Sequence, residues 1–296
     1  MDITHSEAVG TVTTRRDHTE MRSLLAFVGL TFGISWVVWL SLAAAVNGLL
    51  PVPVTSSSVT FMVWMIAGAW APTVAALLIT ARTEGRAGVR SLLSRLGRWR
   101  VNWRWYGVAL LLPFSLAALA SVMHVALGGN PPPGPAMEPF FAPLIVLLVS
   151  LPIHLVVGGA LAEEPGWRGY ALPRLQQRLG MMGAGIVLGL IWWTWHWPTL
   201  LIPGSGQSHL PFGGYFLLMI AWSQLFVWLV NRARGSVLLA VLFHAAMNAA
   251  ISTALPVFLG DDMRAGWIFI GLLWLAALAT IVLPKADPAE VNREHN

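Results

Sequence analysis

The chain has 296 residues, of which 56% are hydrophobic and only 10% are charged, and it contains no cysteine. Soluble domains carry roughly 45–50% apolar and about 25% charged residues, so this composition excludes a soluble globular protein and predicts a polytopic membrane protein. Without cysteine, disulfides and thiolate metal ligands are also excluded.

Residues 1–23 are polar and lack the short apolar core of a secretory signal, so we expect a flexible cytoplasmic tail. Residues 24–284 are expected to form one all-α membrane domain, followed by a second tail, 285–296. Eight stretches in this domain have the roughly 20 apolar residues that cross a bilayer as a helix. They are Leu24–Val46, Val59–Ala81, Tyr106–Leu127, Phe140–Ala162, Met182–Ile202, Phe212–Val230, Ser236–Phe258 and Ala265–Leu283.

The distribution of basic residues predicts the orientation. Of the 18 lysines and arginines, 17 lie in the two tails and in the second, fourth and sixth connections between spans. The remaining one, Arg264, lies in the seventh connection, on the opposite side of the membrane. Because positive charge marks cytoplasmic loops, both termini are expected in the cytoplasm, with the protein in the cell membrane.

The second connection, residues 82–104, is rich in arginine and has apolar residues at helical spacing. This pattern predicts an amphipathic helix that lies on anionic lipid. Trp99, Trp103 and Trp105 are expected to anchor it at the membrane interface. With a span on either side, we expect no nucleic-acid partner.

Two adjacent carboxylates, Glu163 and Glu164, stand at the end of the fourth span. Arg168 follows Glu164 by four residues and can meet it on one helical face, whereas Glu163 points elsewhere and is available for chemistry. Pro165 predicts a kink and a hydrated pocket there. The alternative is a pair of salt-bridged carboxylates at the water boundary.

The fifth and seventh spans carry further polar side chains. His196 lies among four tryptophans, and His244 and Asn248 are four residues apart. Each could simply pack between helices, and the tryptophans could form an aromatic belt. Together with Glu163, however, they supply a base and several hydrogen-bond donors, a set suited to water activation.

Three other features are interpreted as structural. His154 precedes Glu163 by nine residues, which places it on the opposite helical face, and His124 lies near the non-cytoplasmic end of its span. Gly185 and Gly189 form a small-xxx-small pair for close helix packing.

Three motifs, taken in chain order, resemble those of the CAAX protease and bacteriocin-processing enzyme family, which includes type II CAAX prenyl endopeptidases and bacterial Abi proteins. “EEPGWRG”, starting at Glu163, fits EExxxR, His196 stands where the family has FxxxH, and “HAAMN”, starting at His244, fits HxxxN. The resemblance covers roughly residues 135–255. Trp192 replaces the usual phenylalanine of FxxxH.

The resemblance implies an eight-helix intramembrane protease whose cavity opens to the cytoplasm and whose substrate is a membrane protein or peptide. Glu163 would be the general base and His196 its catalytic partner. His244 and Asn248 would stabilise the oxyanion, while the second glutamate and the arginine of EExxxR would support the pocket. Trp192 would line it.

Two matters stay open. His196 and His244 could hold zinc, with Glu163 as ligand or base, although a catalytic zinc usually has three protein ligands. In straight helices at 1.5 Å per residue, Glu163 lies at the cytoplasmic end of its span, His244 about 12 Å deep and His196 about 20 Å deep. Tilt, a kink at Pro165 or a later start of the fifth span is needed to bring them together.

Two other classes of function compete with the protease. A transporter would show matching halves with broken helices, and the first four spans carry no counterpart of EExxxR. A non-catalytic immunity or scaffold protein could retain the whole fold.

Overall fold

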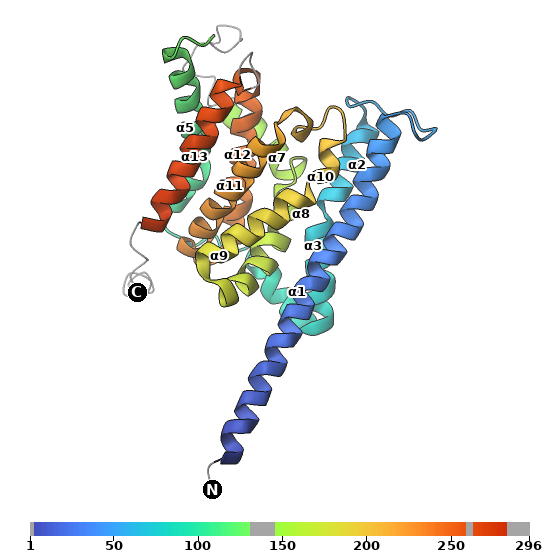
Figure 1. The fold of residues 1–296 in the computed structure, drawn as a ribbon, viewed down its shortest axis with the longest axis vertical. Helices are drawn as coiled ribbons and strands as arrows, with labels where there is room; N and C mark the ends of the chain where they lie inside the picture. Colours follow the sequence, from blue (N-terminus) through green and yellow to red (C-terminus); the bar gives the residue numbers. More distant parts are fainter. Residues whose placement is uncertain (1–2, 131–145, 259–262, 283–296) are drawn as a thin grey trace.

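The computed structural model describes residues 3–130, 146–258 and 263–282, and these ranges are helical, with connecting turns and no strand. The all-α class predicted from the sequence is therefore confirmed (Figure 1). In chain order the helices are α1 (Ile3–Val46), α2 (Val59–Ala69), α3 (Ala71–Thr83), α4 (Gly85–Ser94), α5 (Trp103–Ala126), η1 (Val146–Ser150), α7 (Leu151–Val156), α8 (Ala160–Glu164), η2 (Pro165–Ala171), α9 (Leu172–Trp195), α10 (Trp197–Leu200), η3 (Gln207–His209), α11 (Phe212–Arg232), α12 (Val237–Phe258) and α13 (Arg264–Val282).

Six helical segments of the described part are long and apolar enough to cross a membrane, where the sequence predicts eight spans. They are α1, the segment Val59–Ser94, α5, α11, α12 and α13. The first predicted span forms the C-terminal part of α1, whose backbone is helical from Ile3 onward. The two remaining predicted spans, Phe140–Ala162 and Met182–Ile202, form broken segments, and residues 140–145 lie outside the described ranges.

The described part of the fourth predicted span forms η1, α7 and the start of α8, and η2 follows directly; we call these four elements together the fourth segment. Gly159 lies between α7 and α8 with a φ of 85°, in the left-handed region that glycine tolerates best. Pro165 then starts the π-helical turn η2, consistent with its missing backbone N–H. At Pro165, where a kink was expected, the helix changes from α to π while the backbone stays right-handed helical, and the clear break comes earlier, at Gly159.

The fifth predicted span differs in its boundaries. Helix α9 starts at Leu172, ten residues before the expected Met182, and ends at Trp195, so that His196 stands at the junction with α10. Gly180, with φ 65° and ψ −174°, interrupts α9 near its first third. The broken fourth segment and the early start of α9 together set the positions of the polar side chains.

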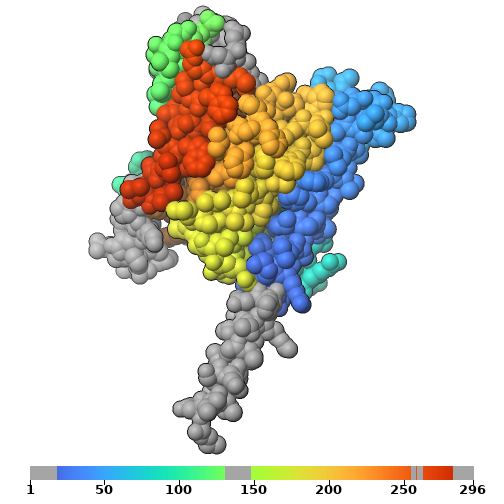
Figure 2. Space-filling view, viewed as in Figure 1, coloured from blue at the N-terminus to red at the C-terminus, as the bar shows by residue number. Residues whose placement is uncertain are grey.

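Helices α11 and α12 form the centre of the bundle. In their most apolar 18-residue stretches, 78% and 67% of residues are buried, against 39% or less in the other candidate spans. Helix α9 packs closely on α11, because Gly185 contacts the Gln224 side chain and Gly189 contacts Ile220 and Ser223. The predicted role of the two glycines is thus confirmed, and Figure 2 shows α13, α11, α9 and α1 in succession across one face.

The arginine-rich connections meet at one end of the bundle. Arg95 donates to the carbonyl of Gly169 at 2.8 Å, and Arg98 donates to that of Arg234 at 2.9 Å. At the other end, Arg264 donates to the carbonyl of Leu127 at 2.8 Å. The orientation of the bundle in the membrane stays a prediction from the distribution of basic residues.

The apolar side chains of α4 differ in exposure, since some pack inside the protein and others lie on its surface. Leu92 is buried and contacts Gly169 in η2, whereas Leu93 is 43% exposed. Trp99 and Trp103, just beyond α4, are also exposed. The predicted contact with anionic lipid thus concerns Leu93 and the two tryptophans, while Leu92 is used for internal packing.

Candidate active site

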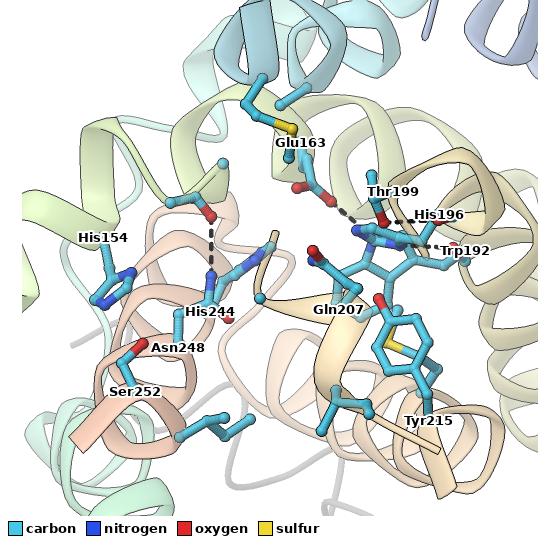
Figure 3. Close-up of a pocket in the computed structure, with 18 of the residues that line it drawn as sticks. His154, Glu163, Trp192, His196, Thr199, Gln207, Tyr215, His244, Asn248 and Ser252 are labelled. Atoms are coloured by element: carbon cyan, nitrogen blue, oxygen red, sulfur yellow. Dashed lines mark hydrogen bonds between the residues drawn. The ribbon is translucent and has the colours of Figure 1, made fainter. Parts of the chain in front are cut away.

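A cavity of about 270 Å³ lies between the broken fourth segment, the C-terminal end of α9, and helices α11 and α12. It is lined by all five of the predicted pocket residues, which are Glu163, Trp192, His196, His244 and Asn248. Figure 3 shows the labelled polar side chains facing one another across it. The breaks in the fourth segment carry Glu163 inward, so the depth difference predicted from straight helices does not separate these side chains.

Glu163 is 4% exposed, and its side chain reaches the cavity wall. The indole Nε1–H of Trp192 donates to Glu163 Oε2 at 2.7 Å. The other oxygen, Oε1, lies against Gly159, and none of the described residues donates a hydrogen bond to it. One carboxylate oxygen is therefore fixed by a neutral donor, and the other is available to a molecule in the cavity.

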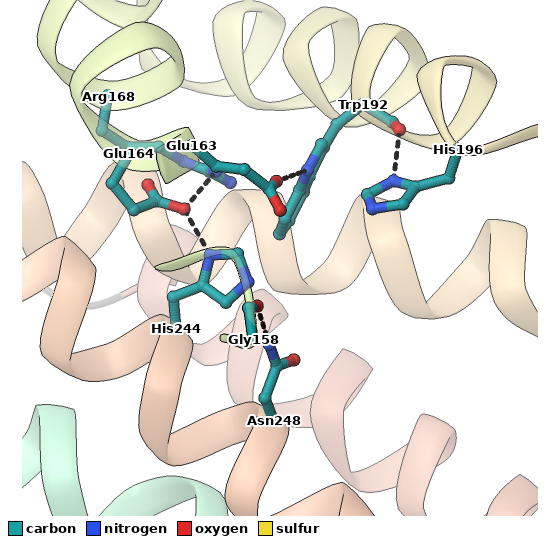
Figure 4. A network of polar contacts seen from close by, with 8 residues as sticks. All are labelled: Gly158, Glu163, Glu164, Arg168, Trp192, His196, His244 and Asn248. Atoms are coloured by element: carbon teal, nitrogen blue, oxygen red, sulfur yellow. Dashed lines mark hydrogen bonds and ion pairs between the residues drawn. The ribbon is translucent and has the colours of Figure 1, made fainter. Parts of the chain in front are cut away.

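Glu164 points in a different direction, into a buried polar network (Figure 4). Its Oε1 accepts from Arg168 Nη1 at 3.0 Å, the i,i+4 contact predicted from the sequence. The same oxygen accepts from His244 Nδ1 at 2.6 Å. The sequence did not predict this second contact, which spans 80 residues and links Glu164 directly to a cavity-lining imidazole.

His196 and His244 are both held through Nδ1. His196 Nδ1 lies 2.9 Å from the backbone carbonyl of Trp192, and His244 Nδ1 lies 2.6 Å from Glu164. Since a carbonyl and a carboxylate accept hydrogen bonds, both Nδ1 atoms carry the proton. In each ring, Nε2 is then the nitrogen available for chemistry in the cavity.

Asn248 connects α12 to the break in the fourth segment. Its Nδ2 donates to the carbonyl of Gly158 at 2.9 Å. An asparagine amide carries two N–H donors, so one remains for a bound group. Asn248 therefore also stabilises the irregular backbone next to Gly159, which carries Glu163 into the cavity.

His154 requires a correction. The sequence placed it on the face opposite Glu163, but it lines the same cavity. Counting nine residues along a helix assumes an unbroken helix, and the chain leaves helical geometry at Gly159. His124, in α5, is not among the lining residues.

Four other polar lining residues were missed: Thr199, Gln207, Tyr215 and Ser252. Ser252 follows Asn248 by four residues, so the periodicity that pairs His244 with Asn248 could have found it. The others lie in α10, in η3 and at the start of α11. Their approach to the cavity depends on the turn after His196, for which the sequence carries no periodic signal.

The donor set does not fit the zinc site considered above. Among the described residues, no group of three or more His, Cys, Asp or Glu side chains is placed to hold a metal ion. A catalytic zinc usually has three protein ligands.

Two comparisons with known proteins bear on this site. Residues 141–250 match the sequence family described as type II CAAX prenyl endopeptidase Rce1-like. The chain is also 26% identical over 272 residues to CAAX prenyl protease 2 of Methanococcus maripaludis, a match covering 86% of this chain and 92% of that protein. The family resemblance predicted from the three motifs is confirmed, and the matched residues include the whole cavity-lining motif set.

Proposed function

We propose that this chain, a relative of the type II CAAX prenyl endopeptidases, is an intramembrane endopeptidase that uses a glutamate-activated water molecule. The observation that carries the proposal is the placement of Glu163. This buried carboxylate has one oxygen fixed by Trp192 and the other open to a cavity that His196 and His244 also line. This arrangement has the parts needed for direct attack of water on a peptide carbonyl.

In the proposed reaction Glu163 Oε1 accepts a proton from water while the water oxygen forms a bond to the scissile carbonyl carbon. Negative charge then develops on the carbonyl oxygen, where His244 Nε2–H and the second N–H of Asn248 can donate. Collapse of the tetrahedral intermediate breaks the C–N bond, and Glu163 returns the proton to the leaving amine. The products are a new carboxylate and a new amine.

His196 and Glu164 have separate supporting roles in this scheme. His196, oriented by the Trp192 carbonyl, presents Nε2 to the attacking water and helps Glu163 to activate it. Glu164 orients His244, which acts in this scheme as the imidazolium, with a proton on each ring nitrogen. Arg168 pairs with Glu164 and holds its carboxylate in place.

The substrate class and orientation are also proposals. The name of the Methanococcus maripaludis relative indicates a prenylated CAAX protein as its substrate. A prenylated peptide is therefore the first probe for this chain. The clustering of the arginine-rich connections at one end supports a cytoplasmic face there, on which residues 82–104 would contact anionic lipid.

The test compares wild type, Glu163→Gln and the control Glu84→Gln in vesicles with a farnesylated CAAX peptide in ¹⁸O-labelled water. Glu84 is an exposed carboxylate outside the cavity, so the control makes the same chemical change away from the site. We expect wild type and the control to release a product with one ¹⁸O in its new carboxylate, and Glu163→Gln to be inactive yet equally stable.

A search that assumes no substrate complements this assay. Membrane proteomes of cells producing wild type or Glu163→Gln are compared for precursors that stay uncut only in the variant. Equal peptide turnover by Glu163→Gln would overturn the mechanism. If wild type cuts neither the peptide nor any membrane precursor, the non-catalytic scaffold is favoured instead.

A further inference from the structure

Trp192 replaces the phenylalanine that the FxxxH motif usually carries, and it makes a contact that phenylalanine cannot make. Its indole N–H donates to Glu163 Oε2 at 2.7 Å within the protein interior. Figure 4 shows Trp192 between Glu163 and His196, joined to each by a hydrogen bond. The backbone carbonyl of Trp192 accepts the hydrogen bond from His196 Nδ1, so that bond does not depend on the Trp192 side chain.

We propose that the Trp192 indole N–H is a positioning donor that fixes the Glu163 carboxylate for attack, an inference that rests on the proposed function. A glutamate side chain has three rotatable bonds, and a buried one without a donor samples several rotamers. A hydrogen bond to an ionised acceptor is stronger than a neutral pair, so one such donor is enough to select a rotamer. With Oε2 fixed, Oε1 stays directed toward the cavity.

The position of the indole is itself fixed by its surroundings. Trp192 is 1% exposed, and its ring packs against Trp222 and Phe226 at centroid distances of 5.0 and 5.8 Å. The Arg168 guanidinium lies 4.3 Å from the ring centroid. A ring enclosed in this way cannot turn its N–H away from Glu163 without repacking the core.

The charge of the donor matters for the chemistry. Glu164 is paired with a guanidinium, which suits a carboxylate that stays ionised. Glu163 instead receives a neutral N–H, which orients the carboxylate without adding a cation to its hydrogen-bond partners. A base that must take up and release a proton is better served by the neutral donor.

The experiment removes the donor while keeping the shape of the ring. Trp192 is replaced by benzothienylalanine, an isostere with sulfur in place of N–H, through suppression of a stop codon, and Trp192→Phe is made in parallel. Trp193→Phe is the control. Trp193 is the next residue, lies outside the cavity lining, and its Nε1 has no hydrogen-bond partner among the described residues.

For the farnesylated CAAX peptide, we expect both changes at position 192 to lower kcat about 10- to 100-fold with KM within about twofold, the pattern of a group that acts in the chemical step. Trp193→Phe is expected to stay within about twofold of wild type.

Wild-type kcat in the benzothienylalanine variant would overturn the inference, since shape alone would then suffice. A rise in KM at unchanged kcat would also overturn it, by assigning Trp192 to substrate binding. Either result leaves the proposed function intact as long as Glu163→Gln is inactive. The benzothienylalanine variant keeps the test valid even if Trp192→Phe fails to fold.

Discussion

The substitution Glu164→Gln tests the buried network in which Glu164 binds both Arg168 and the cavity-lining His244. Glu164 and Arg168 are both buried, with side-chain exposures of 0%. Removing the charge of Glu164 leaves the guanidinium without a counter-charge, and breaking a buried ion pair in this way costs about 3–5 kcal/mol. At about 2–4 °C per kcal/mol, the value for soluble domains of 150–250 residues, Tm falls by roughly 6–20 °C.

The double variant Glu164→Gln, Arg168→Met separates stability from activity. It removes both charges, and such neutral replacements of a buried pair are often as stable as the original. We therefore expect Tm, followed by tryptophan fluorescence in detergent, to recover to within a few degrees of wild type. Peptide turnover should stay at least tenfold reduced, because His244 has lost its carboxylate acceptor.

The reasoning is refuted if Glu164→Gln unfolds at the wild-type temperature, since the pair would then contribute no stability. It is also refuted if the double variant regains full turnover. In that case Glu164 would serve only to neutralise Arg168, and its contact with His244 would have no part in the reaction.

Three further predictions concern the surroundings of the site. Gly159→Ala should lower turnover more than tenfold, because the added Cβ would overlap Glu163 Oε1. The left-handed backbone at this position adds a strain of about 1–2 kcal/mol. Gly180→Ala has similar strain but open space around it, so its turnover should be retained. Asn248→Ala frees the Gly158 carbonyl and should reduce both turnover and Tm, by about 1 kcal/mol of stability. Treatment with 1,10-phenanthroline should leave turnover unchanged, because no three His, Asp or Glu side chains among the described residues are placed to hold a metal ion; zinc-restored activity would contradict this.

Local features of the site could be predicted because helical spacing determines them. The pairing of Glu164 with Arg168 follows from four residues of separation, and the close packing of Gly185 and Gly189 follows from the lack of side chains. Both depend only on residues within about one turn of each other. The membrane class follows from composition for a similar reason, because it needs no knowledge of tertiary contacts.

Features that depend on the shape of the fourth segment could not be predicted. Hydropathy shows an apolar run up to Ala162 but not the left-handed turn at Gly159 or the π-helical turn from Pro165. The turn at Gly159 lies between His154 and Glu163, so a straight-helix count gives these two residues the wrong relative direction, and both line the cavity.

The contact between Glu164 and His244 changes the meaning of the adjacent carboxylates. Spacing alone divides them into a structural glutamate and a catalytic one, but Glu164 also holds a cavity imidazole through the oxygen that binds Arg168. Its negative charge is therefore used twice, once for stability and once to orient His244. Among the described residues, the Trp192 N–H is the hydrogen-bond donor to Glu163. In the proposed reaction the two adjacent glutamates therefore act differently because their partners differ: the carboxylate paired with a guanidinium orients His244, while the one held by a neutral donor exchanges a proton with water.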